Sequence, residues 1–312
     1  MIPKDSNQIL PLSLSQREVW LDQIAWPNSA HLNIGGCLDL TGNIDLELLQ
    51  DALNVLVEES MCLRTILLPK GKQRVLDRYL ETFKYLDFSD TSQPMEYARS
   101  WQQKWMREPF AVFDKPAWRF ALIKVSKNKH LIVIQFHHFI MDGWGTLQVI
   151  KRWAEIYTSL REKAEVPKLT MTYEHYISIS NDFLQNKSGK ERGYWLEEFN
   201  AVPQSIFEKK YHVSRVGSLP DAHLVAHSIS KERYNRCVET ATKQRVTSYH
   251  WVLAAIVVYF ARTKQQAEIT IGVPNLNRTG KKFKSTLGMF VNVLPLKITY
   301  DEQQSFGELS QA

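Results

Sequence analysis

The sequence predicts an α/β protein of two subdomains, and three observations lead to that prediction. Segments with the two-residue period of strands alternate along the chain with segments of helical period. The 312 residues exceed the roughly 250–300 residues at which a single hydrophobic core usually stops growing. With 44% hydrophobic and 23% charged residues, the composition excludes collagen-like, low-complexity and disordered proteins.

The N-terminal part is expected to contain a helix, a strand and a second helix. Ser15–Glu18 has the spacing of a capping box, which predicts that a helix begins there. Residues 31–41 alternate between apolar and polar side chains, as in a half-buried strand. Asp45 can cap a helix whose apolar residues follow at three- and four-residue spacing.

A helix around residues 97–105 and a hairpin come next. Residues 118–125 and 130–136 are apolar runs separated by a short polar segment, which is typical of a hairpin. The second run is apolar on both faces, so we expect this strand to be central in its sheet. Apolar residues from Leu147 to Leu160 indicate a helix directly behind it, joined by the short link 137–145.

The polar stretch 184–193 suggests the boundary between two subdomains, residues 1–183 and residues 184–312. Beyond it we expect helices over 230–246 and 247–263 and strands over 269–274 and 292–300. The most apolar run, 251–260, is about half of the ~20 residues that a membrane span needs, so it is interpreted as a buried helix.

Charge and cysteine content exclude several classes of protein. The net charge of +6 is spread along the chain, and its densest cluster, Lys281–Lys284 beside Arg278, is typical of a solvated loop, which disfavours nucleic-acid binding. The three cysteines are far apart and lack CxxC spacing, which argues against a disulfide framework or a zinc site. No signal peptide is present at the N-terminus, so we expect a cytoplasmic protein without a membrane span.

The residues that point to chemistry lie between 136 and 145. His137 and His138 are adjacent at the end of a buried strand, so their side chains must point to opposite faces. Asp142 can bond backbone groups or a buried cation, and Gly143 allows a close backbone approach to a ligand. A metal site is disfavoured because its other ligands would have to be remote. The alternative is a histidine pair that merely satisfies the core.

The spacing His-His-x-x-x-Asp-Gly, from His137 to Gly143, resembles the active-site motif of condensation domains of nonribosomal peptide synthetases, in the chloramphenicol acetyltransferase superfamily. Other stretches resemble further motifs of that family in the same order: Leu12–Trp20, Leu63–Thr65, Gly193–Trp195, Ile271–Arg278 and Gly288–Leu296. The second motif departs from the pattern, because Ser60 and Met61 stand where the family has a His-Glu pair.

The resemblance implies two chloramphenicol acetyltransferase-like subdomains in a V-shaped pseudodimer. Family members continue beyond the position of Ala312, so the second subdomain is expected to be incomplete. The implied position is the start of a polypeptide, with an adenylation domain downstream. The implied reaction is attack by the amino group of an acceptor aminoacyl thioester on a donor acyl or peptidyl thioester. Both substrates are carried on phosphopantetheine arms of carrier proteins, and no cofactor is bound directly.

The resemblance also implies roles for individual residues. His138 would accept a proton from the attacking amine, or hold the amine and stabilise the tetrahedral intermediate. His137 would support it from the opposite face. Asp142 would form a salt bridge with Arg64 that shapes the loop, and the backbone N–H of Gly143 would contact the oxyanion.

Three further residues are predicted to bind substrate: Trp144, Arg278 and Asn292. For the last two, the alternative is a purely structural role in fixing loop backbones. Two other functions stay open. One is an inactive remnant that binds carrier proteins, and the other is a free-standing acyltransferase that makes esters or amides from acyl thioesters.

Overall fold

The computed structural model describes residues 8–169, 171–207, 225–278 and 280–311. Its contacts divide the chain into two compact units. The first holds the described residues up to Gly189 together with Leu276–Asn292, and the second holds the other described residues. The predicted subdomain boundary, between residues 183 and 184, lies inside helix α5 (Tyr173–Asn186) and stays a prediction.

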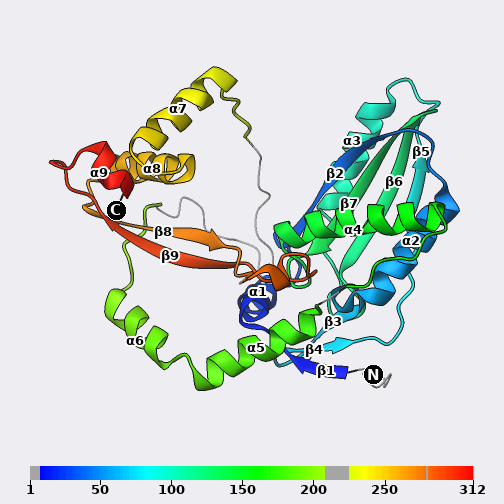
Figure 1. The fold of residues 1–312 in the computed structure, drawn as a ribbon, viewed down its shortest axis with the longest axis horizontal. Coiled ribbons are helices and arrows are strands. Elements are labelled where there is room, and N and C mark those ends of the chain that lie inside the picture. Colours follow the sequence, from blue (N-terminus) through cyan, green and yellow to red (C-terminus); the bar gives the residue numbers. More distant parts are fainter. Residues whose placement is uncertain (1–7, 170, 208–224, 279, 312) are drawn as a thin grey trace. The chain divides into compact units, whose positions relative to one another are not determined.

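A four-stranded sheet is the centre of the first unit (Figure 1). Its order is β2 (Asn33–Thr41), β7 (Lys129–His137), β6 (Trp118–Ser126) and β5 (Lys84–Asp87). Strands β6 and β7 form the predicted antiparallel hairpin, while β5 pairs with β6 in parallel. Because β7 lies between β2 and β6, its predicted central position is confirmed.

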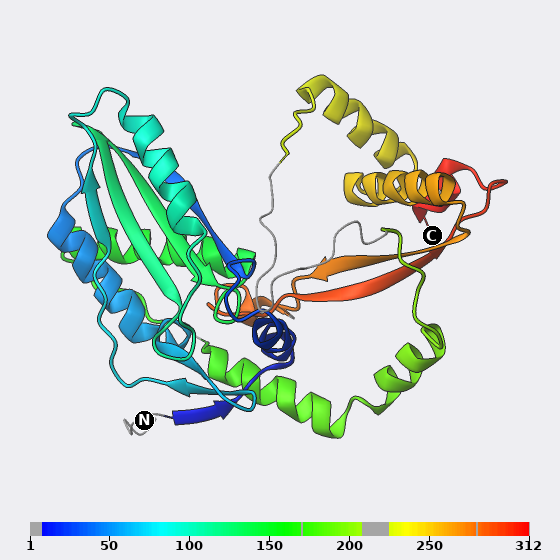
Figure 2. The ribbon, with the colours of Figure 1, turned by 180° about the vertical axis from the view of Figure 1, so that it is seen from behind.

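Side chains on alternate residues of the sheet build two separate cores. In β6, Trp118, Phe120 and Leu122 face a cluster completed by α2 (Leu46–Glu59) and α4 (Gly143–Arg161). The intervening β6 residues instead pack against α3 (Pro94–Met106). Helix α4 therefore covers one face of the sheet in Figure 1, and α3 covers the opposite face, seen in Figure 2. The alternation of β6 leads its side chains to both layers.

Smaller elements complete the first unit. A second sheet has the order β1 (Gln8–Pro11), β4 (Lys72–Val75) and β3 (Thr65–Leu68), and the 3-10 helices are η1 (Met61–Arg64) and η2 (Lys281–Phe283). Helix α1 (Leu14–Ala25) begins two residues before the predicted position, because Ser13 is its N-cap and forms the capping box with Gln16. Asp45 caps α2, as predicted.

The second unit has a thinner core. Its elements are α6 (Gly189–Glu198), α7 (Lys231–Lys243), α8 (Ser248–Lys264), β8 (Glu268–Asn275), β9 (Asn292–Thr299) and α9 (Phe306–Gln311). Strands β8 and β9 pair with each other. The prediction that residues 251–260 form a buried helix is wrong in one respect. Helix α8 buries only one side, while Val252 and Tyr259 are 50% and 62% exposed. Within the described residues, no helix is both long and apolar enough to cross a bilayer.

Candidate active site

The candidate site is the link between β7 and α4. Strand β7 ends at His137, and α4 begins at Gly143 because Asp142 is its N-cap. The Asp142 side chain accepts a hydrogen bond from the N–H of Gly145, with Oδ1 2.6 Å from the nitrogen. The N–H of His138 donates to the carbonyl oxygen of Leu32 at 2.8 Å, so the sheet pairing extends one residue into the link.

His137 is buried, and both of its ring nitrogens form hydrogen bonds inside the protein. The N–H of Phe139 donates to Nδ1 at 3.0 Å, so the neutral ring carries its proton on Nε2. Nε2 then donates to Oε1 of Gln23 on α1, at 2.9 Å. Burial, followed by the charges of His138 and His31, lowers the pKa of His137 to about 3. The ring is therefore neutral at physiological pH and has no nitrogen left for a substrate.

His138 is only partly buried, and its ring is oriented differently. Nδ1 lies 3.2 Å from the sulfur of Met289. The ring also forms hydrogen bonds with the backbone of His138 and of Met141. Burial lowers the pKa of His138, while backbone hydrogen bonds to the ring and the charge of Asp142 oppose that shift. The neutral form thus predominates near pH 7, and its unprotonated nitrogen can accept a proton.

Asp142 is fully buried, and hydrogen bonds occupy its whole carboxylate. Arg278 Nη2 donates to both carboxylate oxygens, at 2.9 and 3.1 Å. Oδ2 also accepts from the N–H groups of Phe290 and Val291, at 2.9 and 3.2 Å. With Gly145 at Oδ1, the carboxylate bonds the α4 N-terminus, the 290–291 backbone and a guanidinium. Such a group fixes the loop and is not placed to accept a substrate proton.

Arg278 has a structural role that matches this one. Its Nη1 donates to the carbonyl oxygens of Phe283 and Thr286, at 2.9 and 2.5 Å. The guanidinium carbon lies 4.0 Å from the ring centroid of Phe290. The Asp142–Arg278 ion pair has side chains 0% and 3% exposed, so the segment after Arg278 and the link between β7 and α4 are joined within the first unit.

Gly145 and Gly288 allow these two segments to approach closely. A Cβ atom on Gly145 would lie 2.5 Å from the sulfur of Met141 and 3.1 Å from the Gly288 carbonyl oxygen. Gly288 has φ +149°, and a Cβ atom there would lie 2.2 Å from the ring of Tyr173. The Gly288 carbonyl oxygen also accepts from the N–H of Asp142, at 3.3 Å. Any larger residue would push the segments apart.

Comparison with known proteins identifies the family. The model of the family described as "Condensation domain" matches residues 6–312. The chain belongs to the condensation-domain family. The predicted family and α/β fold class are thus confirmed. Members of this family are acyltransferases that form amide bonds in nonribosomal peptide synthesis, and the prediction of an enzyme of this class is confirmed with it.

The curated relatives are much longer proteins. The chain is 27% identical over 316 residues to one of the plipastatin synthase proteins of Bacillus subtilis (strain 168), covering 96% of this chain and 12% of that protein. It is also 27% identical to surfactin synthase subunit 2 of the same organism, covering 98% of this chain and 8% of that protein. The chain therefore spans about a tenth of the length of these relatives.

Solved structures show the same fold at lower identity. The first condensation domain of the CDA synthetase superposes with a TM-score of 0.82 at 22% identity, over 98% of this chain and 74% of that chain. A starter condensation domain of rhizomide synthetase, solved in complex with C8-CoA, gives a TM-score of 0.83 at 21% identity, over 97% of this chain and 69% of that chain.

One predicted contact of this condensation domain is wrong: Asp142 pairs with Arg278, not with Arg64. Arg64 instead donates to the carbonyl oxygens of Val57 and Asp77, both at 3.2 Å, and to that of Leu76. Val57 lies in the last turn of α2, where carbonyl groups lack helical partners, and the other two carbonyls directly follow β4. The Arg64 guanidinium binds these three groups, and the carboxylate of Asp142 is left to Arg278.

Three predicted site residues remain: Gly143, Trp144 and Asn292. Gly143 is the exposed first residue of α4, where a backbone N–H has no acceptor within the helix. Trp144 is half-buried, and its indole N–H donates to the Lys284 carbonyl oxygen at 2.8 Å. Asn292 begins β9, and its buried Oδ1 has no hydrogen-bond partner within the described residues. Their roles in binding substrate stay predictions.

Sequence reasoning missed several residues that hold the loop. Gln23 bonds His137, and its position on α1 carries no signal of its own. Ser15 Oγ donates to the Phe290 carbonyl oxygen at 2.7 Å, although its spacing predicts a helix cap. Tyr173 donates to the Met289 carbonyl oxygen. The helical period of α5 indicates that Tyr173 faces inward, but it does not indicate that Met289 is the hydrogen-bond acceptor.

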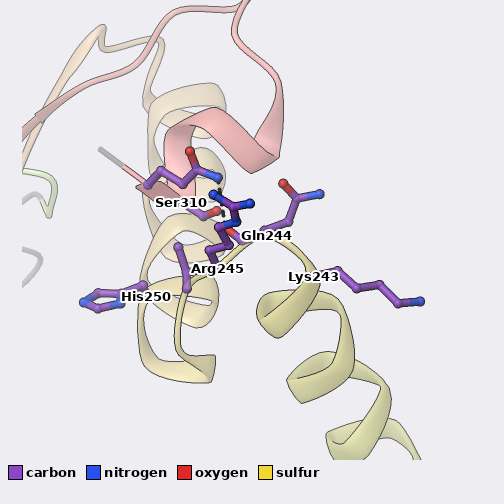
Figure 3. A pocket seen from close by; sticks show the side chains of 7 residues that line it. Lys243, Gln244, Arg245, His250 and Ser310 are labelled. Atoms are coloured by element: carbon purple, nitrogen blue, oxygen red, sulfur yellow. Dashed lines mark hydrogen bonds between the residues drawn. The ribbon is translucent and has the colours of Figure 1, made fainter.

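A surface pocket of about 610 Å³ lies in the second unit (Figure 3). Its lining residues are Lys243, Gln244, Arg245, Val246, His250, Ser310 and Gln311. None of them is a predicted site residue. The cationic side chains there are exposed, which is typical of solvated loops. Among the described residues, no group of three His, Cys, Asp or Glu side chains could hold a metal ion.

Proposed function

We propose that this condensation domain forms an amide bond between a donor acyl or peptidyl thioester and the amino group of an acceptor aminoacyl thioester. Both would arrive on phosphopantetheine arms of carrier proteins. The observation that carries the proposal is the contrast within the histidine pair. His137 is buried and uses both ring nitrogens inside the protein, whereas His138 has a partly exposed ring on a loop that buried hydrogen bonds fix.

The proposed chemistry needs one proton acceptor. The acceptor nitrogen attacks the donor carbonyl carbon, and His138 Nε2 takes the proton that the nitrogen loses. When the tetrahedral intermediate collapses, the C–S bond breaks and the thiolate leaves with that proton. The thioester is already activated, so positioning supplies much of the rate.

The other residues are proposed to assist at fixed places. The N–H of Gly143, free of an intrahelical acceptor, would stabilise the oxyanion of the intermediate. Trp144 and Asn292 would contact substrate. Asp142 and Arg278 would hold the loop and take no part in proton transfer, because the carboxylate oxygens and both Nη groups are engaged with each other and with the backbone.

Two properties of the whole protein belong to the same proposal. The curated relatives named above are synthase proteins many times longer than one domain, which supports carrier proteins as partners of this domain and an adenylation domain elsewhere in the assembly. A cytoplasmic location would bring the domain together with those partners.

The test uses the full chain, a donor carrier loaded with an acyl group and an acceptor carrier loaded with an amino acid. Mass spectrometry of the intact acceptor carrier detects the amide product. We expect His138→Ala to lower the rate at least about 100-fold, the smaller end of general-base catalysis. His227→Ala, an exposed histidine of the second unit, is the matched control and should keep the rate.

The same assay separates the alternatives. A His138→Ala variant that folds and turns over like the wild type contradicts the proposed role of His138. Binding of loaded carriers without any turnover supports the inactive remnant. A coenzyme A thioester offered in place of the donor carrier tests the free-standing acyltransferase, a candidate favoured by the similar starter domain that was solved with C8-CoA.

A further inference from the structure

Two buried glutamine side chains of the first unit bind each other, and one of them also binds the link between β7 and α4. Gln16 on α1 and Gln73 on β4 are 1% and 0% exposed. Gln16 Nε2 donates to Gln73 Oε1 at 2.9 Å, and Gln73 Nε2 donates to Gln16 Oε1 at 3.0 Å. We call these two side chains the amide pair. The second N–H of Gln16 donates to the carbonyl oxygen of Phe139, the residue after His138, at 3.2 Å.

The backbone just before α1 determines how each amide is oriented. The Ser13 N–H donates to Gln16 Oε1 at 3.0 Å, and the Pro11 carbonyl oxygen accepts from Gln73 Nε2 at 2.9 Å. If the Gln16 amide were turned over, its NH2 group would face the Ser13 N–H, which also donates. If the Gln73 amide were turned over, its oxygen would face the Pro11 carbonyl oxygen, which also accepts. The observed orientation is therefore the one that presents an N–H of Gln16 to Phe139.

The Phe139 carbonyl group belongs to a tight turn around His138. The Ile140 N–H donates to the His137 carbonyl oxygen at 3.0 Å, and the Phe139 N–H donates to the His137 ring. These two bonds are local, so a turn held by them alone could still tilt about the end of β7. The Phe139 side chain is buried, but apolar packing is not directional and does not orient a carbonyl group. The bond from Gln16 supplies that direction from α1.

We propose that Gln16 and Gln73 are positioning residues for the reaction: the amide pair holds the Phe139 carbonyl group and thereby sets the direction in which the neighbouring His138 side chain leaves the backbone. The catalytic consequence rests on the proposed function, whereas the fixed carbonyl group does not. The alternative is that the amide pair only satisfies buried polar groups between α1 and β4. In that case it stabilises the fold and leaves the link unaffected.

The first measurement follows the Phe139 carbonyl group itself in the wild type and in Gln16→Met, a variant of similar side-chain length without an N–H to donate. Phe139–Ile140 is the only Phe–Ile pair in the sequence. Protein labelled with carbonyl carbon-13 phenylalanine and nitrogen-15 isoleucine therefore gives a single carbon–nitrogen NMR signal, from this peptide group. We expect the carbonyl carbon to move upfield in Gln16→Met, because it loses a hydrogen-bond donor.

Hydrogen exchange tests whether the effect is local. In Gln16→Met, exchange of the Ile140 amide should accelerate more than exchange of the β6 amides, which report the overall stability of the unit. A pair that only stabilises the fold would accelerate both by the same factor.

The amide-forming assay separates positioning from stability. Loss of one neutral hydrogen bond corresponds to a roughly threefold to tenfold fall in kcat for Gln16→Met, with KM for the acceptor carrier unchanged. Gln73→Met leaves the bond from Gln16 to Phe139 in place and should lower kcat less. The double variant removes both amides together, so its stability should exceed the value that the two single losses add up to, while its kcat stays as low as that of Gln16→Met.

Gln135→Met is the matched control. Gln135 on β7 is also a fully buried glutamine of the first unit, but its amide donates to the Met106 carbonyl oxygen, at 2.7 Å, and not to the link. We expect this variant to lose stability and to keep kcat at a temperature where it remains folded.

The outcomes are separable. An unchanged Phe139 carbonyl signal in folded Gln16→Met overturns the inference, and so does a kcat that is unchanged or merely follows stability across the variants. If Gln16→Met does not fold, the double variant takes its place, because it leaves neither amide without its partner. Absence of amide formation by the wild type would overturn the proposed function and leave the NMR and exchange results standing.

Discussion

The two units bury their apolar residues to different extents. In the first, a large cluster joins both helices of one sheet face to the strands, and a second cluster lies under α3. In the described part of the second, the buried cluster is small: Ala254, Val257, Ala261, Ile269 and Leu309. Helix α8 there exposes apolar side chains at helical spacing: Tyr249, Val252, Ile256 and Tyr259.

The difference extends to polar contacts. The ion pair of the first unit, Asp142–Arg278, is excluded from solvent and bonded to the backbone on both sides. The pair Lys297–Glu198 of the second unit has side chains 25% and 33% exposed. A buried ion pair that is also hydrogen-bonded to the backbone fixes one geometry, whereas an exposed pair adds little. We infer that the catalytic loop owes its precision to the first unit alone.

Breaking the buried pair is the strongest test of that inference. Asp142→Asn leaves the Arg278 charge without its partner, and we expect a loss of about 3–5 kcal/mol in the free energy of unfolding. Urea unfolding of the wild type, Asp142→Asn, Arg278→Gln and the double variant measures the coupling between the two residues. Coupling below about 0.5 kcal/mol would mean that the pair acts as two independent groups, against the comparison.

A variant at Asp142 that unfolds also loses activity, so the effect on folding must be separated from an effect on catalysis. Activity is measured at a temperature where each variant remains folded by circular dichroism. If folded Asp142→Asn retains most of its turnover, the carboxylate acts through structure, as we propose. A folded variant without any turnover would give Asp142 a chemical role.

Core truncations provide the next test. Ile134 in β7 and Ile269 in β8 are both fully buried, one in each unit. Replacement of either by alanine is expected to cost about 2–5 kcal/mol, with Ile134→Ala near the upper end and Ile269→Ala near the lower end. A small cluster can relax around the lost atoms more completely than a large one. Equal losses in chemical unfolding would contradict the ranking.

The sequence could predict what depends on local pattern. Period and capping predicted β2, α2, the β6–β7 hairpin and α4, because each needs only its own neighbours to decide which face is buried. The motif spacing also located the link between His137 and Gly143, and strand alternation separated the two histidines. These features depend on residues close in sequence.

The rest depends on contacts between distant residues. Arg64 and Arg278 each carry a guanidinium group that could pair with Asp142, and the neighbouring sequence does not indicate which one does. The partner is determined by the backbone carbonyl groups that lie near each arginine in the folded chain. Similarly, Ser13 and Ser15 both precede a helix-compatible Gln or Glu by three residues. The Ser15 hydroxyl donates to the carbonyl oxygen of Phe290, 275 residues later in the chain, and Ser13 is the N-cap.

The pH dependence of stability tests the burial of His137 in the first unit. Its pKa is lowered from 6.5 to about 3 when the protein folds, chiefly by burial. Below pH 6.5 the unfolded chain binds a proton that the folded one does not, so this contribution is complete above pH 6.5 and is lost as the pH falls toward 3. His137→Gln can form both hydrogen bonds but cannot titrate.

We therefore expect the stability of the wild type to fall faster than that of His137→Gln between about pH 6.5 and pH 4. Urea midpoints at closely spaced pH values measure this difference. His227→Gln, at an exposed position of the second unit, is the control and should follow the wild type. Parallel curves for wild type and His137→Gln would show that the ring of His137 takes up its proton equally well in the folded and the unfolded protein. Burial would then not lower its pKa.

The smallest effect is expected at Lys297 in the second unit. Its ammonium lies 3.0 Å from Glu198 Oε1 and 5.5 Å from the ring centroid of Phe199, so it connects β9 to α6 through contacts that water can replace. Lys297→Met keeps the aliphatic stem over the ring and removes only the charge. We expect a small shift of the urea midpoint that shrinks further at high salt, because exposed pairs are screened. A shift of the urea midpoint as large as that of Asp142→Asn would mean that the exposed Lys297–Glu198 pair stabilises its unit as much as the buried Asp142–Arg278 pair stabilises the first. That result would contradict the proposed difference between the two units.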